Sequence, residues 1–417
     1  MIWTALVLLL LAILGAPLFA VIAAAALASF SRGGVDGMAV LAEIYRIANM
    51  PVLLALPLFT FAGYLLGESG APKRLVRVTN ALLGWLPGGL AIVAMVTCAL
   101  FTAFTGASGV TIVALGALLY PALRQGGYRE NFSLGLLTTS GSLGLLFPPS
   151  LPLILYGIVA QVHVEQLFRA GILPGLLMVV LLSGWCLRDG WRLPTRAEPF
   201  SWREAGAALK GAAWELPLPV IVLGGVYTGL FAVSEVAAVT ALYVLIVEVV
   251  IYRDVSPRRL VAIMRDASVM VGGILIILGA SLASTNALID AQVPMKLFAF
   301  VQEHISSKWT FLIILNIFLL VLGAMLDIFS ALVIVVPLIL PIAVGYGIEP
   351  VHLGMIFLAN MQIGYSTPPV GMNLFLASYR FNKPILQLYR STLPFLIILF
   401  LTVLIITYWP GLSLALL

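Results

Sequence analysis

Apolar runs separated by short polar or basic stretches follow one another along almost the whole chain. Many of them hold about twenty residues, the length of helix that crosses a hydrocarbon core of about 30 Å. Two further runs, 88–123 and 309–343, are interrupted near their centres by small or polar residues. The pattern predicts an all-α polytopic membrane protein with crossings near residues 3–30, 51–67, 131–162, 168–187, 214–232, 236–252, 268–289, 351–379 and 392–411.

The two interrupted runs are expected to be re-entrant helical hairpins. In the first, the cluster Thr105-Gly106-Ala107-Ser108-Gly109 lies between two apolar arms, and basic loops flank both ends. In the second, Gly323 to Ser330 holds the same central position. Like-charged ends on one side favour a hairpin that returns to its own side of the membrane. A single kinked crossing is the alternative.

Backbone-breaking residues recur 220 positions apart. Pro121, Gly127, Gly144, Pro148 and Pro149 match Pro341, Gly347, Gly364, Pro368 and Pro369. Between 121 and 154 these are the five identities in thirty-four aligned pairs, and all are Gly or Pro. Proline interrupts a helix because it lacks an N–H and clashes with the preceding turn. Paired broken helices, here about 131–162 and 351–379, are typical of the binding site of a secondary transporter.

Charge predicts the orientation. With the loops alternating between the two sides, seventeen of the 22 Lys and Arg residues face the cytoplasm, as the positive-inside rule requires. The N-terminus is then cytoplasmic and the C-terminus periplasmic, and the hairpins enter from opposite faces. This predicts two inverted-topology repeats, 1–187 and 234–417, joined by a basic connector and linking span over 188–233.

Composition excludes several classes of protein. Hydrophobic residues make up 62% of the chain and charged residues 9%, which excludes a soluble domain. The net charge of +5 is scattered over short loops, so no nucleic-acid partner is expected. The run 2–30 is read as a retained span, with a cleaved signal as the alternative. No phosphate-binding loop, HExxH or GxSxG motif is present, so no enzyme activity or transition metal is expected.

The breaks themselves suggest the chemistry. Near each Pro-Pro pair, peptide carbonyls lose their helical amide partners, and the candidates are Gly144, Phe147 and Pro149 in the first half and Gly364, Thr367 and Val370 in the second. Carbonyl dipoles can replace the hydration shell of an alkali ion without a formal charge. Sodium is therefore the predicted coupling ion, with no organic cofactor. The alternative is a pair of proline kinks whose carbonyls are satisfied by water or hydroxyls.

Side chains near the breaks extend these candidate sites. Thr105, Ser108 and Thr111 add hydroxyls at the first tip, although small-residue helix packing would explain the same composition. Asp327 is the one acid of the second hairpin. A carboxylate at that depth is costly unless it is paired or solvated, so it either belongs to an ion site or caps the helix that follows.

Three polar side chains in the broken crossings, Ser140, Asn360 and Asn373, face either a solute or a neighbouring helix. The half-helix N-termini of these crossings favour an anionic solute such as a carboxylate. A small organic acid is the expected substrate.

The chain resembles the large membrane subunit of tripartite ATP-independent periplasmic (TRAP) transporters over most of its length. The segments that carry the resemblance are LPLFTFAGYLLGESG (56–70), LPGGLAIVAMVTCALFTAFTGASGVTIVALG (86–116), GSLGLLFPPSLPLILYG (141–157), LGAMLDIFSALVIVVPLILPIA (322–343) and IGYSTPPVGMNLFLAS (363–378).

That resemblance implies an elevator-type sodium symporter for small organic acids in the bacterial inner membrane. It also implies two partners in addition to the lipid bilayer, a small four-span membrane subunit and a soluble periplasmic solute-binding protein. One sodium site would use Thr105, Ser108, Gly144, Phe147 and Pro149; the other would use Gly323, Asp327, Gly364, Thr367 and Val370.

Three rival functions stay open at this point. One is a self-sufficient sodium–carboxylate symporter or ion antiporter of the same fold, which would need no partner for uptake. Another is a membrane-embedded enzyme, for which the chain lacks a recognisable acid, base and nucleophile constellation. The third is a passive anchoring subunit, for which the prolines of the breaks would be dispensable.

Overall fold

A computed structural model describes residues 6–8, 10–11, 14–32, 36–191 and 199–417. Within these residues the chain forms helices, turns and no strand. The prediction of an all-helical polytopic fold is confirmed. By length and composition, seven helices of the described residues are able to cross a membrane, or up to eight if one bent pair counts as a single span.

The first half ends with a long helix that follows a hairpin and a broken helix. Its elements are α2 (Leu18–Arg32), α3 (Met38–Ala48), η1 (Pro51–Leu54), α4 (Ala55–Glu68), α5 (Ala71–Leu83), α6 (Gly89–Thr105), α7 (Ser108–Gln125), α8 (Glu130–Ser140), η2 (Leu143–Leu146), α9 (Leu151–Ala160) and α10 (Val164–Gly190).

A linking region leads into a second half with the same succession of helices. The elements are α11 (Trp202–Gly211), α12 (Pro217–Tyr227), α13 (Val233–Leu245), the π-helix η3 (Ile246–Ile251), α14 (Pro257–Asp290), α15 (Val293–His304), α16 (Lys308–Met325), α17 (Ile328–Gly345), α18 (Pro350–Gly364), α19 (Met372–Phe381), α20 (Ile385–Tyr408) and α21 (Gly411–Leu414).

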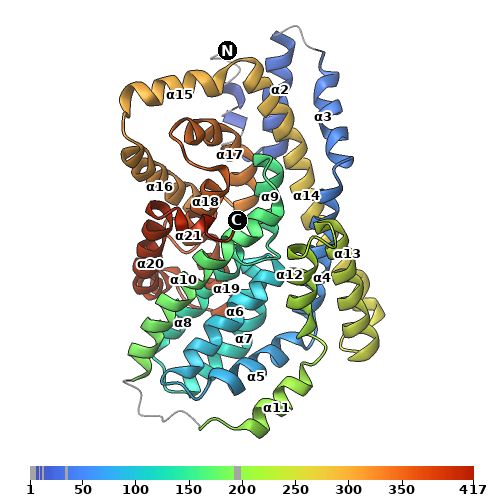
Figure 1. The fold of residues 1–417 in the computed structure, drawn as a ribbon, viewed down its shortest axis with the longest axis vertical. Coiled ribbons are helices and arrows are strands. Elements are labelled where there is room, and N and C mark those ends of the chain that lie inside the picture. Colours follow the sequence, from blue (N-terminus) through green and yellow to red (C-terminus); the bar gives the residue numbers. More distant parts are fainter. Residues whose placement is uncertain (1–5, 9, 12–13, 33–35, 192–198) are drawn as a thin grey trace.

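The helix bounds repeat with the sequence offset of 220. The arms α6 and α7 correspond to α16 and α17, and α7 plus 220 coincides with α17 at both ends. The parts α8 and α9 correspond to α18 and α19, and α10 corresponds to α20. Figure 1 shows α5 near one end of the molecule and α15 at the other, as two repeats in inverted orientation would lie.

Each hairpin packs against the broken helix of the other half. Helix α7 of the first hairpin contacts α19 of the second broken helix, and α17 contacts α9 in the equivalent way. At the centre, Ser142 and Gln362 occupy the same repeat position, and the Ser142 hydroxyl donates to the Gln362 carbonyl at 3.3 Å. This contact joins the two broken helices at residues 220 positions apart.

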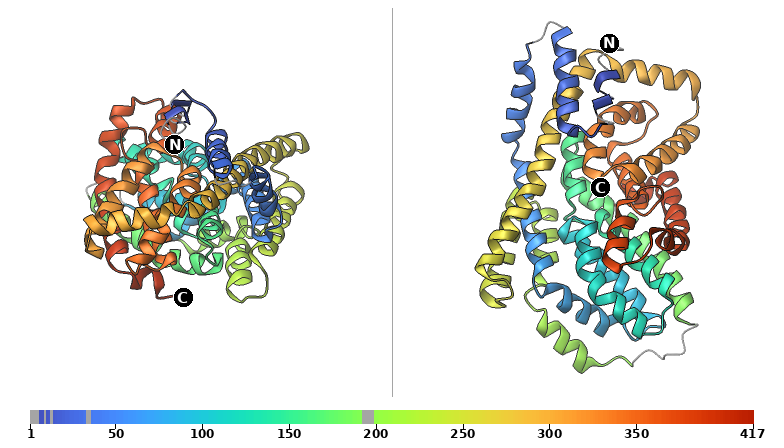
Figure 2. Two further views of the ribbon diagram at one scale, coloured as in Figure 1. Left: turned by 90° about the horizontal axis from the view of Figure 1, so that it is seen from above. Right: turned by 180° about the vertical axis from the view of Figure 1, so that it is seen from behind.

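A layer of helices flanks this central bundle on one side. Helices α2 and α3 pack against α14, and α13 packs against α4. Figure 2 shows this layer beside the bundle in both views. The described part of the first expected span, 3–30, differs from the prediction because a turn at Leu14 and Gly15 precedes α2. Gly15 has φ +88°, and Pro17 follows it, so a continuous helix stops there. Residues 1–5, 9 and 12–13 of that span and 192–198 of the expected connector lie outside the described residues.

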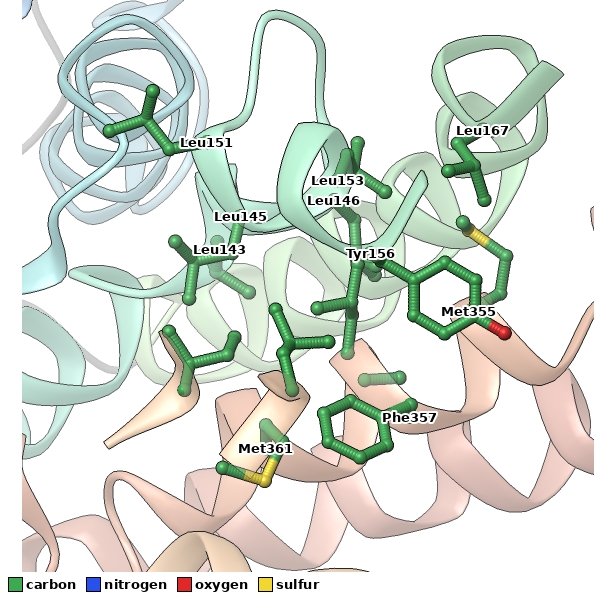
Figure 3. Close-up of a cluster of buried hydrophobic side chains, with 14 of the residues drawn as sticks. Leu143, Leu145, Leu146, Leu151, Leu153, Tyr156, Leu167, Met355, Phe357 and Met361 are labelled. Atoms are coloured by element: carbon green, nitrogen blue, oxygen red, sulfur yellow. The ribbon is translucent and has the colours of Figure 1, made fainter. Parts of the chain in front are cut away.

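The core lies where the two broken helices meet. Figure 3 shows leucines of η2 and α9 against Met355, Phe357 and Met361 of α18. Tyr156 is completely buried there, and its hydroxyl donates to the carbonyl of Pro350 at 2.6 Å. A Cβ on Gly354 would lie 2.7 Å from the Tyr156 ring, so only glycine admits this ring. The breaks therefore rest on a close-packed apolar base.

An ion cluster around the buried Glu248 holds α5 to the chain between α11 and α14. Arg74 contacts Glu248 at 2.8 Å, Asp254 at 2.6 Å and also Glu215. Glu248 is completely buried in η3. Burial opposes the charge on Arg74, but the hydrogen bond with Asp254 and the charge of Glu248 outweigh it, so the pKa of Arg74 is raised. The cluster fixes the corner between α4 and α5, just before the first hairpin.

Candidate functional site

Both hairpin tips and both breaks of the broken helices lie near the middle of the molecule. Helix α6 packs against η2, and α16 packs against α18, so each tip is beside the break of its own repeat. The peptide bonds Pro148–Pro149 and Pro368–Pro369 are both cis. The candidate residues of each site therefore come from a tip and from the break next to it.

Glycine allows the first tip and the first break to approach closely. A Cβ on Gly144 would lie 2.3 Å from the Ala99 carbonyl oxygen and 2.4 Å from the Ala103 nitrogen, both in α6. Thr105 ends α6 and is fully buried, and its hydroxyl has no hydrogen-bond partner among the described residues. The first candidate site thus holds an oxygen atom whose hydrogen-bonding capacity is unused.

Two of the six candidate carbonyls are not free. The Gly144 carbonyl accepts from the Phe147 amide at 3.0 Å, and the Gly364 carbonyl accepts from the Thr367 amide at 2.9 Å. The prediction that they lack an amide partner is wrong, because the chain tightens into a short i to i+3 turn at each break. Each of these oxygens keeps one further lone pair.

The other four carbonyls, those of Phe147, Pro149, Thr367 and Val370, accept no hydrogen bond within the described structure. In a continuous helix they would accept from the amides four residues later, those of Leu151, Leu153, Gly371 and Leu374. The chain leaves the helical conformation at each break, so these amides do not reach them; Gly371, for example, donates to Ala324 instead. Phe147 is half-buried and Pro149 is buried, whereas Val370 is 42% exposed. Each break thus carries two peptide oxygens able to accept a cation or water.

The second candidate site is built on direct contact between two backbones. A Cβ on Gly364 would lie 2.5 Å from the carbonyl carbon of Gly323, so no side chain fits between α16 and α18 there. The amide of Gly371 donates to the Ala324 carbonyl at 2.9 Å, which ties the far end of the break to the same tip. Gly323 and Gly364, which the resemblance assigns to one site, therefore lie next to each other.

Asp327 caps helix α17. One carboxylate oxygen accepts from the amides of Phe329 at 2.9 Å and Ser330 at 3.0 Å. The Tyr365 hydroxyl accepts from the Ile328 amide, so the first turn of α17 is satisfied from two directions. The capping alternative is realised, and the second carboxylate oxygen makes no hydrogen bond with described residues and remains available to a cation.

The first tip is tied to the second broken helix. The Ser108 hydroxyl donates to Asn373 Oδ1 at 2.8 Å, and Asn373 Nδ2 donates to the Thr138 carbonyl at 3.5 Å. Asn373 is fully buried. Asn373 therefore joins the two repeats in this structure.

The remaining candidates have different surroundings. Asn360 donates to Asn316 Oδ1 at 2.7 Å, so it faces a neighbouring helix, and its own Oδ1 is buried without a donor. The Ser140 hydroxyl is likewise buried and has no partner in the described structure. Thr111 shares a hydrogen bond of 2.6 Å with Thr102.

Two residues beside the breaks were missed. Thr102 donates to the Gly141 carbonyl at 2.8 Å and so links α6 to the first break. A threonine in an otherwise apolar arm was the available signal. Tyr365 has no such signal, because its role depends on the position of α17 and not on its neighbours in the sequence.

The two breaks differ in exposure. Around Pro149 every residue from Gly141 to Leu151 is buried or half-buried, whereas Pro368, Pro369 and Val370 are all exposed. The first break is enclosed by α6 and α10, which contact η2. The second break thus opens widely onto the surface of the described structure. At the first break only Phe147 and Pro148 are half-buried, and they line a pocket of about 260 Å³ together with residues of α6, α10 and α12.

A polytopic helical protein with paired hairpins and paired broken helices, and with uncommitted backbone oxygens at each break, belongs to the class of membrane transport proteins. The family model described as "tripartite ATP-independent periplasmic transporter, DctM component" matches residues 2–412. The chain belongs to this family. It is a transport subunit of the inner membrane and not an enzyme.

Curated relatives agree along most of the chain. It is 35% identical to the C4-dicarboxylate TRAP transporter large permease protein of Pseudomonas aeruginosa, over 93% of this chain and 90% of the relative. It is 31% identical to the ectoine/5-hydroxyectoine large permease protein of Ruegeria pomeroyi, over 87% and 85%. It is 29% identical to the 2,3-diketo-L-gulonate large permease protein of Escherichia coli, over 86% and 85%.

Among solved structures, the chain is similar to the Alcanivorax borkumensis YdaH transporter, which is described as having an unusual topology. The TM-score is 0.62 at 15% identity, over 89% of this chain and 87% of the other. This likeness concerns the fold alone.

Proposed function

We propose that this chain is the permease subunit that carries a small organic acid into the cell, coupled to sodium entry. The observation that carries the proposal is the pair of breaks, each with two carbonyls that accept no hydrogen bond within the described structure. Oxygen dipoles of this kind suit an alkali cation. The named substrates of the relatives, among them C4-dicarboxylates, support an organic acid as cargo.

Each site combines a tip with a break. Site one comprises Thr105 with the carbonyls of Phe147 and Pro149, and Ser108 and Gly144 frame it. Site two comprises the free oxygen of Asp327 with the carbonyls of Thr367 and Val370, and the contact between Gly323 and Gly364 sets their spacing. Movement of the hairpins and broken helices as one body past the flanking layer would carry the cargo, which is an elevator mechanism.

Energy and partners follow from the same proposal. Each net positive charge that enters down a potential of 100 mV contributes about 2.3 kcal/mol. Two sodium ions with a monoanion would therefore make uptake electrogenic, and a dianion such as a C4-dicarboxylate would need a third sodium ion for the same effect. A small membrane subunit and a periplasmic binding protein complete the tripartite system that the family description names. The N-terminus then lies in the cytoplasm and the C-terminus in the periplasm.

The test is uptake of a labelled C4-dicarboxylate into proteoliposomes. We expect uptake when a sodium gradient, the small subunit and the binding protein are all present. Uptake without sodium would refute the coupling, and full uptake by this chain alone would favour a self-sufficient symporter. The variants Pro149→Ala and Pro369→Ala should lower uptake, whereas an anchoring subunit would tolerate them.

A further inference from the structure

A pocket with both polar and apolar side chains lies between three helices. Its volume is about 460 Å³, and it is lined by the start of α8, the end of α10 and the first turns of α20. Ligand pockets have volumes of roughly 300–1,000 Å³. None of the candidate sodium residues lines it. The pocket is therefore large enough for a ligand and separate from both proposed sodium sites.

The pocket holds uncommitted positive charge. Arg129 and Arg390 line it, both are exposed, and neither side chain makes an ion pair or hydrogen bond with a described residue. Glu130 is instead neutralised by Lys383, and it also accepts from Tyr120 at 3.2 Å. Asp189 is the one unpaired acid of the lining, so the two arginines leave the pocket a net positive charge.

An aromatic ring is part of the lining. Trp185 lies near the end of α10, and the Arg188 guanidinium lies over its ring, 4.9 Å from the centroid. A cation over an aromatic face is attracted to the ring, so Arg188 helps to hold the indole in place.

The equivalent groove of the other half is filled by the chain itself. The residues 220 positions away from the pocket lining lie at the start of α18, at the end of α20 and in the middle of α10. Helix α21 packs there, against α10 and α18. Its Ser413 hydroxyl lies 3.2 Å from Nδ1 of His352, which is the counterpart of Phe132 in the pocket. One groove is thus covered by the chain itself, and its counterpart is an open pocket with two free arginines.

We propose that this pocket binds the phosphate head group of an anionic phospholipid. Arginine forms charge-assisted, frequently bidentate hydrogen bonds with phosphate. The pocket lies at the end of the molecule where basic residues concentrate, and the cytoplasmic leaflet offers anionic lipids there. Tryptophan is enriched at this depth because its ring is apolar and its N–H is polar. The apolar walls formed by Phe132, Pro394 and Phe395 suit the glycerol and upper acyl chain more than a free ion.

The experiment is native mass spectrometry and thermal unfolding of the purified transporter complex in detergent. Phosphatidylglycerol, phosphatidylcholine and inorganic phosphate are added separately. We expect phosphatidylglycerol to bind at least about tenfold more tightly than phosphatidylcholine. The double variant Arg129→Gln/Arg390→Gln should lose at least about tenfold in that affinity.

The control is Arg380→Gln, an exposed arginine of α19 that does not line the pocket. It should bind phosphatidylglycerol as the unaltered protein does. Equal binding of the two lipids, or unchanged binding by a folded double variant, would overturn the proposal. Protection by inorganic phosphate as strong as that by phosphatidylglycerol would reject a lipid and assign the pocket to a free anion.

Discussion

The replacement Gly364→Ala tests whether backbone contact between α16 and α18 sets the geometry of the proposed second sodium site. The new Cβ would lie 2.5 Å from the Gly323 carbonyl carbon, 2.6 Å from its Cα and 3.0 Å from the Ala324 nitrogen. Carbon atoms in contact prefer about 3.5–4.0 Å. Because the nearest atoms are backbone, the two helix ends must separate by about 1 Å.

This separation has two expected costs. Overpacking of this kind lowers the free energy of unfolding by about 1–3 kcal/mol. A displacement of about 1 Å can cost about 100-fold where geometry is demanding. A loss of about tenfold in sodium affinity, which equals about 1.4 kcal/mol, is therefore a conservative expectation.

The assay is the initial rate of uptake in proteoliposomes that contain both partners, measured over a range of sodium concentrations. We expect a higher half-saturating sodium concentration for Gly364→Ala. Gly323→Ala should have a smaller effect, because its nearest contact is 3.1 Å. Thermal unfolding in sodium chloride and in potassium chloride reports sodium binding separately from transport.

The matched control is Gly272→Ala in α14, where a new Cβ meets nothing within 4 Å. Alanine has the higher helix propensity, so this variant should be as stable as the unaltered protein or slightly more so. A folded Gly364→Ala protein with an unchanged sodium requirement would refute the reasoning. Equal damage from Gly272→Ala would refute it too.

Three further predictions concern the anchors of the site. Arg74→Ala should lower the free energy of unfolding by about 3–5 kcal/mol, because Glu248 is left buried and unpaired. The control Arg77→Ala breaks the exposed ion pair with Glu204 and should change the free energy of unfolding by under about 1 kcal/mol in the same thermal assay. Asp327→Asn keeps a side chain that can cap α17 and removes its charge, so sodium affinity should fall more than the free energy of unfolding. An unchanged sodium titration would show that the carboxylate acts only as a helix cap. Ser108→Ala leaves the Oδ1 atom of the buried Asn373 without its donor and should lower the free energy of unfolding by about 1–3 kcal/mol. A double-mutant cycle that finds no coupling between positions 108 and 373 would contradict a stabilising hydrogen bond between them.

The positions of the breaks could be predicted because their cause is local. Two consecutive prolines remove two amides in succession, and the helices are interrupted at Pro148-Pro149 and at Pro368-Pro369. Single prolines do not have this effect here, since Pro121 and Pro341 lie inside α7 and α17. The offset of 220 is also visible in the helix bounds, since helix α17 begins and ends 220 residues after α7. Where prediction failed, at the carbonyls of Gly144 and Gly364, the turn chosen after the break depended on packing against the tips.

Sequence alone determined the membrane class, the family, the places where the helices break and the repeat that relates them. These follow from hydrophobic length and from backbone chemistry, which act over a few residues. Only the tertiary structure decided that Ser108 reaches Asn373, that Asp327 caps α17, and that one groove is covered by α21 while its counterpart is open. Such contacts join residues up to 265 positions apart, and they depend on how whole helices pack, which no local pattern encodes.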